Sequence, residues 1–138
     1  MIRVTRDDFS VDEEIRRIVR PSVGGVATFV GTVRDESEAG RVTRMEIEVY
    51  PEMAERQLEA IRGEAIEKFG VEDVLVVHRY GDLNVGDNIV LVAVAAGHRA
   101  EAFDACRYVV DELKKRVPIW KREHTPAGGR WVEAGRPD

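Results

Sequence analysis

Two lysines in the last quarter of the chain, Lys114 and Lys121, have neighbours that would hold a cation in place beside an apolar surface. Lys114 falls in a predicted helix over residues 99–117, and at about 100° per residue it lies at the border of the apolar stripe, just beyond Phe103. Lys115 points to the opposite, solvent side. An ammonium at such a border can lie at the margin of a cleft, where desolvation and neighbouring cations alter its protonation. The alternative is that Lys114 is an ordinary surface lysine, whose aliphatic part packs on apolar side chains while its ammonium stays in water.

Lys121 follows a Pro-Ile-Trp segment that should restrict its position. Pro118 ends the helix, because a proline disfavours the helical conformation of the residue before it. We expect Ile119 and Trp120 to form a large buried anchor, so that Lys121 loses much of its freedom, as a catalytic or ligand-orienting cation requires. The alternative is that these residues have only structural roles: Pro118 ends the helix, Trp120 packs in the core, and Lys121 is an ordinary solvated charge.

The distribution of charge suggests a small anionic ligand. The whole chain has a formal net charge of −5, which argues against nucleic acid as the main partner. The window from Lys114 to Arg136 has a net charge of +5, so the rest of the chain carries −10. A local basic site on an acidic body is typical of a protein that binds a small anion.

Three further groups at the ends of predicted elements could bind an anion. Arg34 ends a predicted strand, His98 and Arg99 stand where an apolar strand meets a helix start, and His78 with Arg79 ends another strand as a weaker candidate. Each could equally be a structural or solvated side chain. The single cysteine, Cys106, lies in the middle of the predicted helix on its buried face, which favours a small core residue over a nucleophile.

Hydrophobic periodicity and capping signals predict the elements that position these side chains. Ser10 and Glu13 form a capping box for a short helix that Pro21 closes, and Gly70 suits the residue after a second helix. The predicted elements are strands over 24–33, 43–50, 74–80 and 88–96 and helices over 51–69 and 99–117, with residues 81–87 as a hairpin loop between the last two strands. Strand 88–96 is apolar throughout and is therefore expected to be central.

Length and composition limit the class of protein. A chain of 138 residues with 43% hydrophobic content predicts a single domain over residues 1–138. One cysteine excludes an internal disulfide and a multi-cysteine metal site, and we expect neither a metal nor a cofactor. The chain shows no signal-peptide pattern and no membrane span, which predicts a cytoplasmic protein with no membrane partner.

Five motifs, in this order, resemble the catalytic (large) subunit of molybdopterin synthase: "FVGTVRD", "YPEMA", "HRYGDLNVGD", "AGHRAEAFDACRYVVDELKKRVPIWKRE" and "RWVEA". The resemblance covers nearly the whole chain. The run from "HR" through "PIWK" is its most specific part, whereas the loop "DESEAGRV" departs from similar proteins, which often carry asparagine and glycine there.

The resemblance implies an α+β fold of the α/β-hammerhead type, with a mostly antiparallel sheet and about three helices. It implies a homodimer within a 2:2 heterotetramer that includes a small ubiquitin-like sulfur-carrier subunit. The carrier's C-terminal Gly-Gly thiocarboxylate would deliver two sulfurs that convert cyclic pyranopterin monophosphate, a small anionic pterin, into molybdopterin. The absence of an activated cysteine and of a nucleotide-binding glycine motif agrees with sulfur that a partner delivers and that is activated elsewhere.

Carried over residue by residue, the resemblance assigns roles to the candidate side chains. Lys114 is implied as the main catalytic group of this sulfurtransferase, with Lys121 assisting. His98 and Arg99 match an anion-binding pair, and Arg34 matches a strand-end arginine that reaches into the pocket, partly across the dimer interface. The weaker substrate-binding candidate is Arg136, whose register is shifted, while Phe29, Met53 and Trp120 are expected to be packing or tail-groove residues.

The alternative is a non-catalytic dimeric module that binds an anionic metabolite or a Gly-Gly carrier tail. Such a module would keep Arg34, His98 and Arg99, but it would have no need for both Lys114 and Lys121. Nucleic-acid binding through the basic C-terminal segment is disfavoured by the net charge and by the lack of an aromatic stacking platform.

Overall fold

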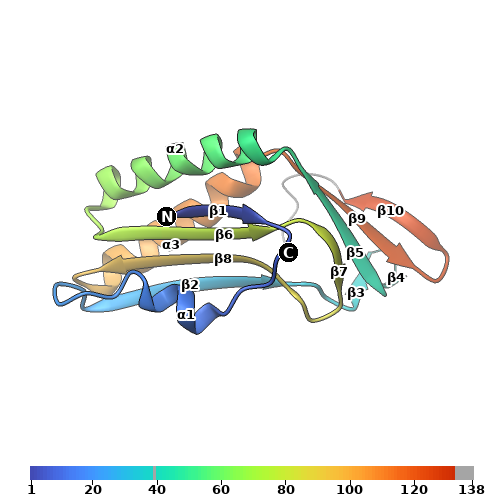
Figure 1. Cartoon of the computed structure of the whole chain (residues 1–138), viewed down its shortest axis with the longest axis horizontal. Coiled ribbons are helices and arrows are strands. Elements are labelled where there is room, and N and C mark those ends of the chain that lie inside the picture. Colours follow the sequence, from blue (N-terminus) through green and yellow to red (C-terminus); the bar gives the residue numbers. More distant parts are fainter. Residues whose placement is uncertain (39, 133–138) are drawn as a thin grey trace.

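A computed structural model describes residues 1–38 and 40–132 (Figure 1). They form two four-stranded sheets, one two-stranded sheet, and helices that cover one of the four-stranded sheets. In chain order the elements are β1 (Ile2–Thr5), α1 (Val11–Arg16), β2 (Gly25–Thr32), β3 (Glu36–Ser37), β4 (Gly40–Arg41), β5 (Arg44–Val49), α2 (Pro51–Phe69), β6 (Asp73–Arg79), β7 (Gly81–Asn84), β8 (Asn88–Ala96), α3 (Arg99–Arg116), β9 (Ile119–Thr125) and β10 (Gly128–Val132). The expected α+β class, with a mostly antiparallel sheet and about three helices, is confirmed for the described part of the chain.

The main sheet has the strand order β1-β6-β8-β2, in which only the β1–β6 pairing is parallel. Strand β8 lies inside the sheet and is buried from Ile89 to Ala96, which confirms the prediction that the apolar strand is central. Strand β1 was not predicted, because four residues are too short for a clear alternation of polar and apolar side chains.

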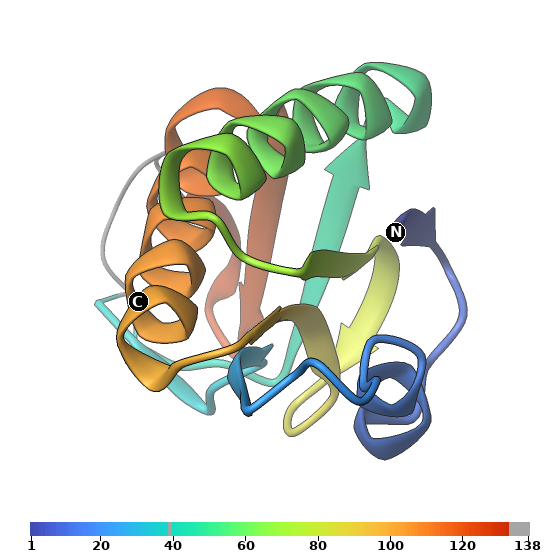
Figure 2. The ribbon, with the colours of Figure 1, turned by 90° about the vertical axis from the view of Figure 1, so that its left-hand side faces the viewer.

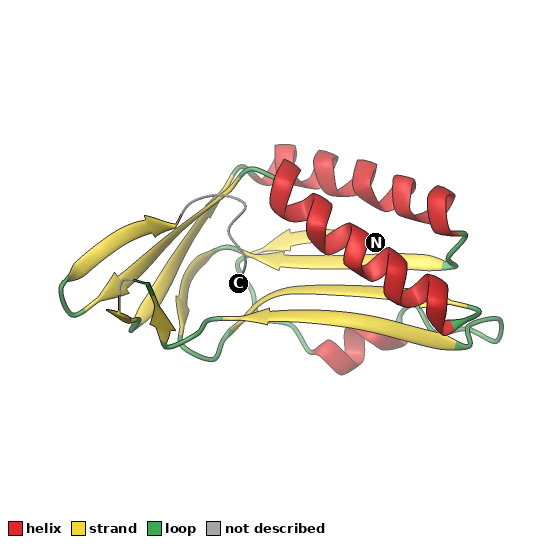
Figure 3. Cartoon of the chain, turned by 180° about the vertical axis from the view of Figure 1, so that it is seen from behind, coloured by secondary structure: helices red, strands yellow, loops and turns green. Residues whose placement is uncertain are grey.

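Helices cover both faces of this sheet (Figures 2 and 3). Along β6 the side chains alternate, so that Val74 and Val76 pack in the cluster with α2 and α3, while Leu75 and Val77 pack in the cluster on the α1 side. Strand β6 is therefore buried on both faces. Because His78 continues the alternation of Val74 and Val76, its ring belongs to the face that α2 and α3 cover.

The second sheet has the strand order β10-β9-β5-β7 and lies beyond one end of the main sheet (Figure 1). Two expectations are corrected here. Residues 81–87 are not a plain hairpin loop, because β7 pairs with β5 and Leu83 is buried opposite Met45. The segment after Pro118, expected above to be a buried anchor, is the strand β9, which pairs with β5 on one side and β10 on the other. Its charged residues hide the strand pattern in the sequence.

The bounds of α2 and α3 and the start of α1 agree with the capping signals, whereas α1 ends at Arg16, several residues before Pro21, which was expected to close it. In α1 the Ser10 side chain accepts a hydrogen bond from the Glu13 amide at 3.3 Å. Helix α2 begins at Pro51 and is capped by Gly70, whose φ of 67° is left-handed. One side chain of α3 was placed wrongly, since Phe103 is 65% exposed rather than at the edge of the buried stripe. None of the helices in residues 1–38 and 40–132 is long and apolar enough to cross a membrane.

A polar cluster joins the C-terminal part of α3 to α2. The Arg116 guanidinium donates hydrogen bonds to both carboxylate oxygens of Glu64, at 2.6 and 2.9 Å, and the Tyr108 hydroxyl donates to Oε1 of Glu64 at 2.7 Å. These bonds, first from Arg116 and then from Tyr108, lower the pKa of Glu64 to about 2. The last turn of α3 is thereby held against α2.

The chain makes a close backbone approach just before β2 that only glycine permits. The Gly24 amide donates to the Ala96 carbonyl at 2.9 Å, and a Cβ on Gly24 would lie 2.2 Å from the carbonyl oxygen of Gly97. A Cβ on the adjacent Gly25 would meet open space, with no atom within 4 Å outside Gly25 and its two chain neighbours.

We therefore expect Gly24→Ala to lower the free energy of unfolding by about 1–3 kcal/mol, because backbone atoms must move to admit the methyl group. Gly25→Ala is the matched control and should change it by no more than about 0.5 kcal/mol. Urea denaturation followed by circular dichroism measures both. Equal midpoints for the two variants would contradict the close packing at Gly24.

Candidate active site

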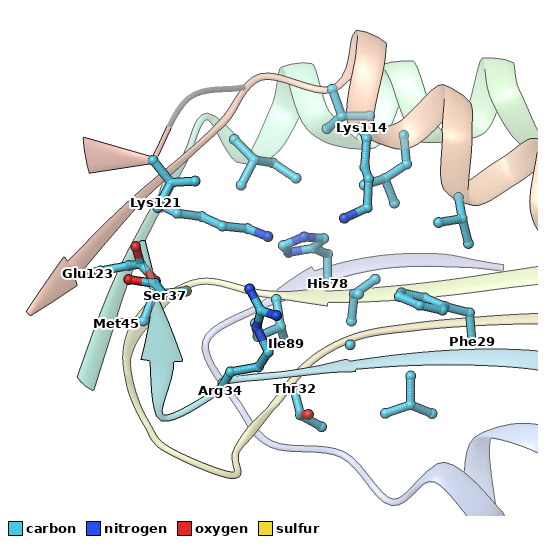
Figure 4. Close-up of a pocket in the computed structure, with 18 of the residues that line it drawn as sticks. Phe29, Thr32, Arg34, Ser37, Met45, His78, Ile89, Lys114, Lys121 and Glu123 are labelled. Atoms are coloured by element: carbon cyan, nitrogen blue, oxygen red, sulfur yellow. The ribbon is translucent and has the colours of Figure 1, made fainter. Parts of the chain in front are cut away.

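A cavity of about 410 Å³ lies where the end of α3 meets the two sheets (Figure 4). Its apolar wall comes from β2, β8 and α3, for example Phe29, Val92 and Leu113. Three of the candidate residues, Arg34, Lys114 and Lys121, line it together although they come from different elements. The volume is within the range of small-molecule sites, roughly 300–1,000 Å³.

Lys114 and Lys115 lie on different faces of α3, as the helical periodicity predicted. Lys114 is half-buried and lines the cavity (Figure 4). The Lys115 side chain is 71% exposed, and its Nζ lies 3.6 Å from Oε2 of Glu112. The two adjacent lysines thus occupy different environments. Lys115 faces solvent, whereas Lys114 faces the cavity, where a bound ligand would lose contact with water.

Lys121 is positioned by strand pairing rather than by a buried tryptophan. Trp120 is 52% exposed, so the expected buried anchor is wrong. In β9 the side chains alternate, and Lys121 shares the cavity side with Ile119 and Glu123 while Trp120 points the other way. Backbone pairing with Ile47 on β5 and Val132 on β10 holds Lys121 from both sides.

The charges that line the cavity are mostly positive. Besides the two lysines and Arg34, the described lining includes Arg130, against the carboxylates of Glu38 and Glu123. Glu123 is 7% exposed and lies 3.6 Å from Nε of Arg130, an ion pair that is too long for a hydrogen bond. Four basic and two acidic side chains leave a positive cavity on an acidic chain, which favours an anionic ligand.

His78 also lines the cavity and was only a weak candidate from the sequence. Its side chain is buried, and Nδ1 lies 2.8 Å from the Arg79 carbonyl oxygen. The pKa of His78 is lowered to about 4, mainly by burial and to a smaller extent by the positive charges of Lys121 and Lys114. The hydrogen bond to the Arg79 carbonyl acts in the opposite direction and raises it. Arg79 itself points elsewhere, because its guanidinium donates to the Asn88 and Arg6 carbonyls. The signal that could have found His78 is its alternation with Val74 and Val76.

The remaining candidates do not reach this cavity in one chain. His98 is the N-cap of α3 and Arg99 its first residue, and both are exposed. Lys114 lies 15 residues further along the helix, about 22 Å at 1.5 Å per residue. Arg136 lies outside the described residues. Within residues 1–38 and 40–132 no three His, Cys, Asp or Glu side chains could together hold a metal ion.

The burial of His78 predicts a pH dependence of stability. Because its pKa is about 4 in the folded chain and 6.5 by default, the unfolded chain binds more protons between these values. Stability should therefore fall as the pH falls from 6.5 to 4, by about 3 kcal/mol at most at ~1.4 kcal/mol per pH unit. His78→Gln should flatten this slope in urea titrations, whereas His98→Gln, at an exposed site, should not. An unchanged slope in His78→Gln would contradict a buried neutral imidazole.

Comparison with known proteins agrees with this geometry. The model of the MoaE protein family matches residues 4–116. A molybdopterin synthase catalytic subunit of Pyrococcus abyssi is 48% identical over 130 residues, which cover 94% of this chain and 88% of that protein. The crystal structure of molybdopterin synthase from Staphylococcus aureus matches with a TM-score of 0.90 at 31% identity, over 95% of this chain and 96% of that chain.

A more distant structure shares the fold. It is the complex of subunits 1 and 2 of molybdopterin-converting factor from Helicobacter pylori, with a TM-score of 0.79 at 18% identity, over 96% of this chain and 90% of that chain. Because the family model covers most of the chain and the relatives match along nearly all of it, the chain belongs to the MoaE protein family, as the sequence resemblance predicted.

Proposed function

We propose that this chain is the catalytic subunit of a molybdopterin synthase and acts as a sulfurtransferase. In this reaction two small ubiquitin-like carriers each deliver the one sulfur of their C-terminal thiocarboxylate to cyclic pyranopterin monophosphate, which becomes molybdopterin. Water takes up the acyl group of each tail, which leaves as a carboxylate. The observation that carries the proposal is that Lys114 and Lys121 line one cavity with Arg34. A module that only bound an anion would not require two lysines at one apolar wall.

The cavity suits a monophosphate attached to a flat, partly apolar ring system. Phosphate is bound well by arginine side chains, and Arg34 and Arg130 supply two guanidinium groups from different segments. The apolar wall that includes Phe29 and Val92 would contact the ring. We therefore assign Arg34 to the phosphate.

The two lysines would act when the acyl–sulfur bond of the carrier tail breaks. In that step negative charge develops on the carbonyl oxygen of the tail and on the departing sulfur. An ammonium at a largely apolar wall stabilises such charge more strongly than water does, because the local dielectric constant is low. We assign this role to Lys114, which would stabilise the charge or donate a proton, with Lys121 assisting.

The proposed assembly is a homodimer within a 2:2 heterotetramer that includes the carrier. The Helicobacter pylori structure is a complex of two subunits, which supports a second chain in the family. His98 and Arg99 lie outside the cavity of their own chain, about 22 Å along α3 from Lys114. We propose that they contribute to anion binding in the cavity of the second protomer.

The sulfur must come from the partner, because Cys106 is unsuited to carry it. It is the only cysteine in the sequence and is 7% exposed on α3. Burial raises the pKa of its thiol to about 11, so the nucleophilic thiolate is scarce at neutral pH.

Cys106→Ala should therefore leave sulfur transfer within about twofold of the wild-type rate, because the side chain only packs in the core. The measurement is molybdopterin formation with preformed carrier thiocarboxylate. A folded Cys106→Ala protein without activity would show that the sulfur passes through this residue.

Lys114→Ala should lower the single-turnover rate of sulfur transfer by about 10² or more, because it removes charge stabilisation made in the transition state. Lys115→Ala, the matched control one residue along and on the solvent face, should be close to silent. Lys121→Ala should be intermediate.

The same assay separates the proposed enzyme from a binding module. Carrier binding and circular dichroism should be unchanged in all three lysine variants, since exposed or half-exposed ammonium groups contribute about 0.5 kcal/mol or less to stability. If Lys114→Ala and Lys115→Ala turn over at the same rate, the catalytic assignment is wrong and the binding module replaces it.

A further inference from the structure

His78 is a polar residue of the cavity to which the proposed reaction, as described above, gives no task. It is 2% exposed at the end of β6, on the face that also carries Val74 and Val76. Its backbone is paired with Val4 on β1 and Val90 on β8, so strands flank it on both sides. A histidine held this firmly presents one fixed atom to the cavity.

The tautomer of the ring follows from the contact between Nδ1 and the Arg79 carbonyl oxygen. The Arg79 carbonyl oxygen can only accept a hydrogen bond, so Nδ1 of His78, at 2.8 Å, must carry the proton. A neutral ring with a proton on Nδ1 has its lone pair on Nε2. The buried imidazole therefore offers an acceptor, and not a donor, at Nε2.

The charged groups that line the cavity around the ring come from three elements, α3, β9 and β10, and from the segments that follow β2 and β3. Lys121 and Glu123 lie on β9, Lys114 on α3, Arg34 after β2, Glu38 after β3 and Arg130 on β10. Figure 4 shows the ring of His78 between the ends of the Lys114 and Lys121 side chains. The charge of Lys121 acts on the ring more strongly than that of Lys114.

We propose that His78 is the positioning residue of the lysine pair: its Nε2 accepts a hydrogen bond from the Lys121 ammonium during sulfur transfer and directs that ammonium at the carrier's thiocarboxylate. The inference rests on the proposed function. His78 itself does not touch the substrate, and it acts through Lys121.

A neutral acceptor suits this task better than a carboxylate. A carboxylate would hold an ammonium more tightly, but it would also cancel the positive charge that the reaction needs. An imidazole orients the N–H bond and leaves the charge in place. A protonated imidazole would lose its acceptor and add a third positive charge beside the two lysines.

Two substitutions separate the two nitrogens of the ring. In His78→Asn the amide N–H can replace Nδ1–H and keep the bond to the Arg79 carbonyl, but no atom reaches the position of Nε2. In His78→Gln the longer side chain places its amide oxygen near the position of Nε2 as an acceptor. If His78 only supports the local fold through Arg79, His78→Asn should be the milder change; if it acts through Nε2, His78→Gln should be.

We expect His78→Asn to slow single-turnover sulfur transfer by about 10-fold to 100-fold with little change in substrate KM, since a misplaced catalytic group lowers the rate of the chemical step. His78→Gln should recover to within about threefold of wild type. Equal rates in the two variants, or a faster His78→Asn, would overturn the proposal. Wild type and Lys114→Ala are assayed in the same experiment. An inactive wild type would contradict the proposed function itself. An active wild type together with a fully active His78→Asn would contradict the role of His78 alone.

A measurement on the intact site makes the test independent of whether these variants fold. In ¹⁵N-histidine NMR of the wild-type chain, His78 should show a protonated Nδ1 and an unprotonated Nε2 at neutral pH. Lys121→Met should shift the Nε2 resonance and raise the pKa of His78, because a neighbouring positive charge is removed. Lys115→Met is the control and should leave both unchanged. A His78 Nε2 signal that does not respond to Lys121→Met overturns the proposal.

Discussion

The site depends on the way the chain passes from α3 into β9 at Val117 and Pro118. The helix ends at Arg116, and Pro118 both disfavours helical backbone before it and provides no N–H for a further helical bond. Three residues later Lys121 is already paired on both sides, with β5 and with β10. A short connection between two rigid elements is what brings Lys114 and Lys121 to one cavity, because neither has a long loop over which its position could vary.

Several features make it possible to hold so many cations near an apolar wall. The C-terminal end of a helix carries partial negative charge, which favours the ammonium of Lys114 there. The bonds of Arg116 and Tyr108 to Glu64 hold the C-terminal half of α3 against α2, outside the cavity. Inside it, the buried carboxylate of Glu123 compensates part of the positive charge of Arg130. The excess positive charge that remains is what an anionic substrate would neutralise.

Features of the fold and the site could be predicted from the sequence where the pattern that indicates them lies within one segment. The different faces of Lys114 and Lys115 follow from helical periodicity within one segment, and so did the bounds of α2 and α3. The strand β9 was not recognised, because its sequence alternates exposed Trp120 with partly buried Lys121 and one of its two partners, β5, lies 70 or more residues earlier. His78 was undervalued for a related reason: only the cavity formed by distant strands distinguishes it from a structural histidine.

The position of His98 and Arg99 cannot be explained by the cavity of their own chain. Helix α3 is a rigid rod, so groups at its start and groups in its last turn, about 22 Å apart, cannot converge on one small ligand. Both ends of α3 nevertheless suit anions. The N-terminal end offers backbone N–H groups and two basic side chains, and the C-terminal end offers Lys114 beside Lys121 in the cavity. In the proposed homodimer one helix would then serve two cavities, its own through Lys114 and that of the second protomer through Arg99. Dimerisation would in that case complete the binding site rather than merely stabilise the fold.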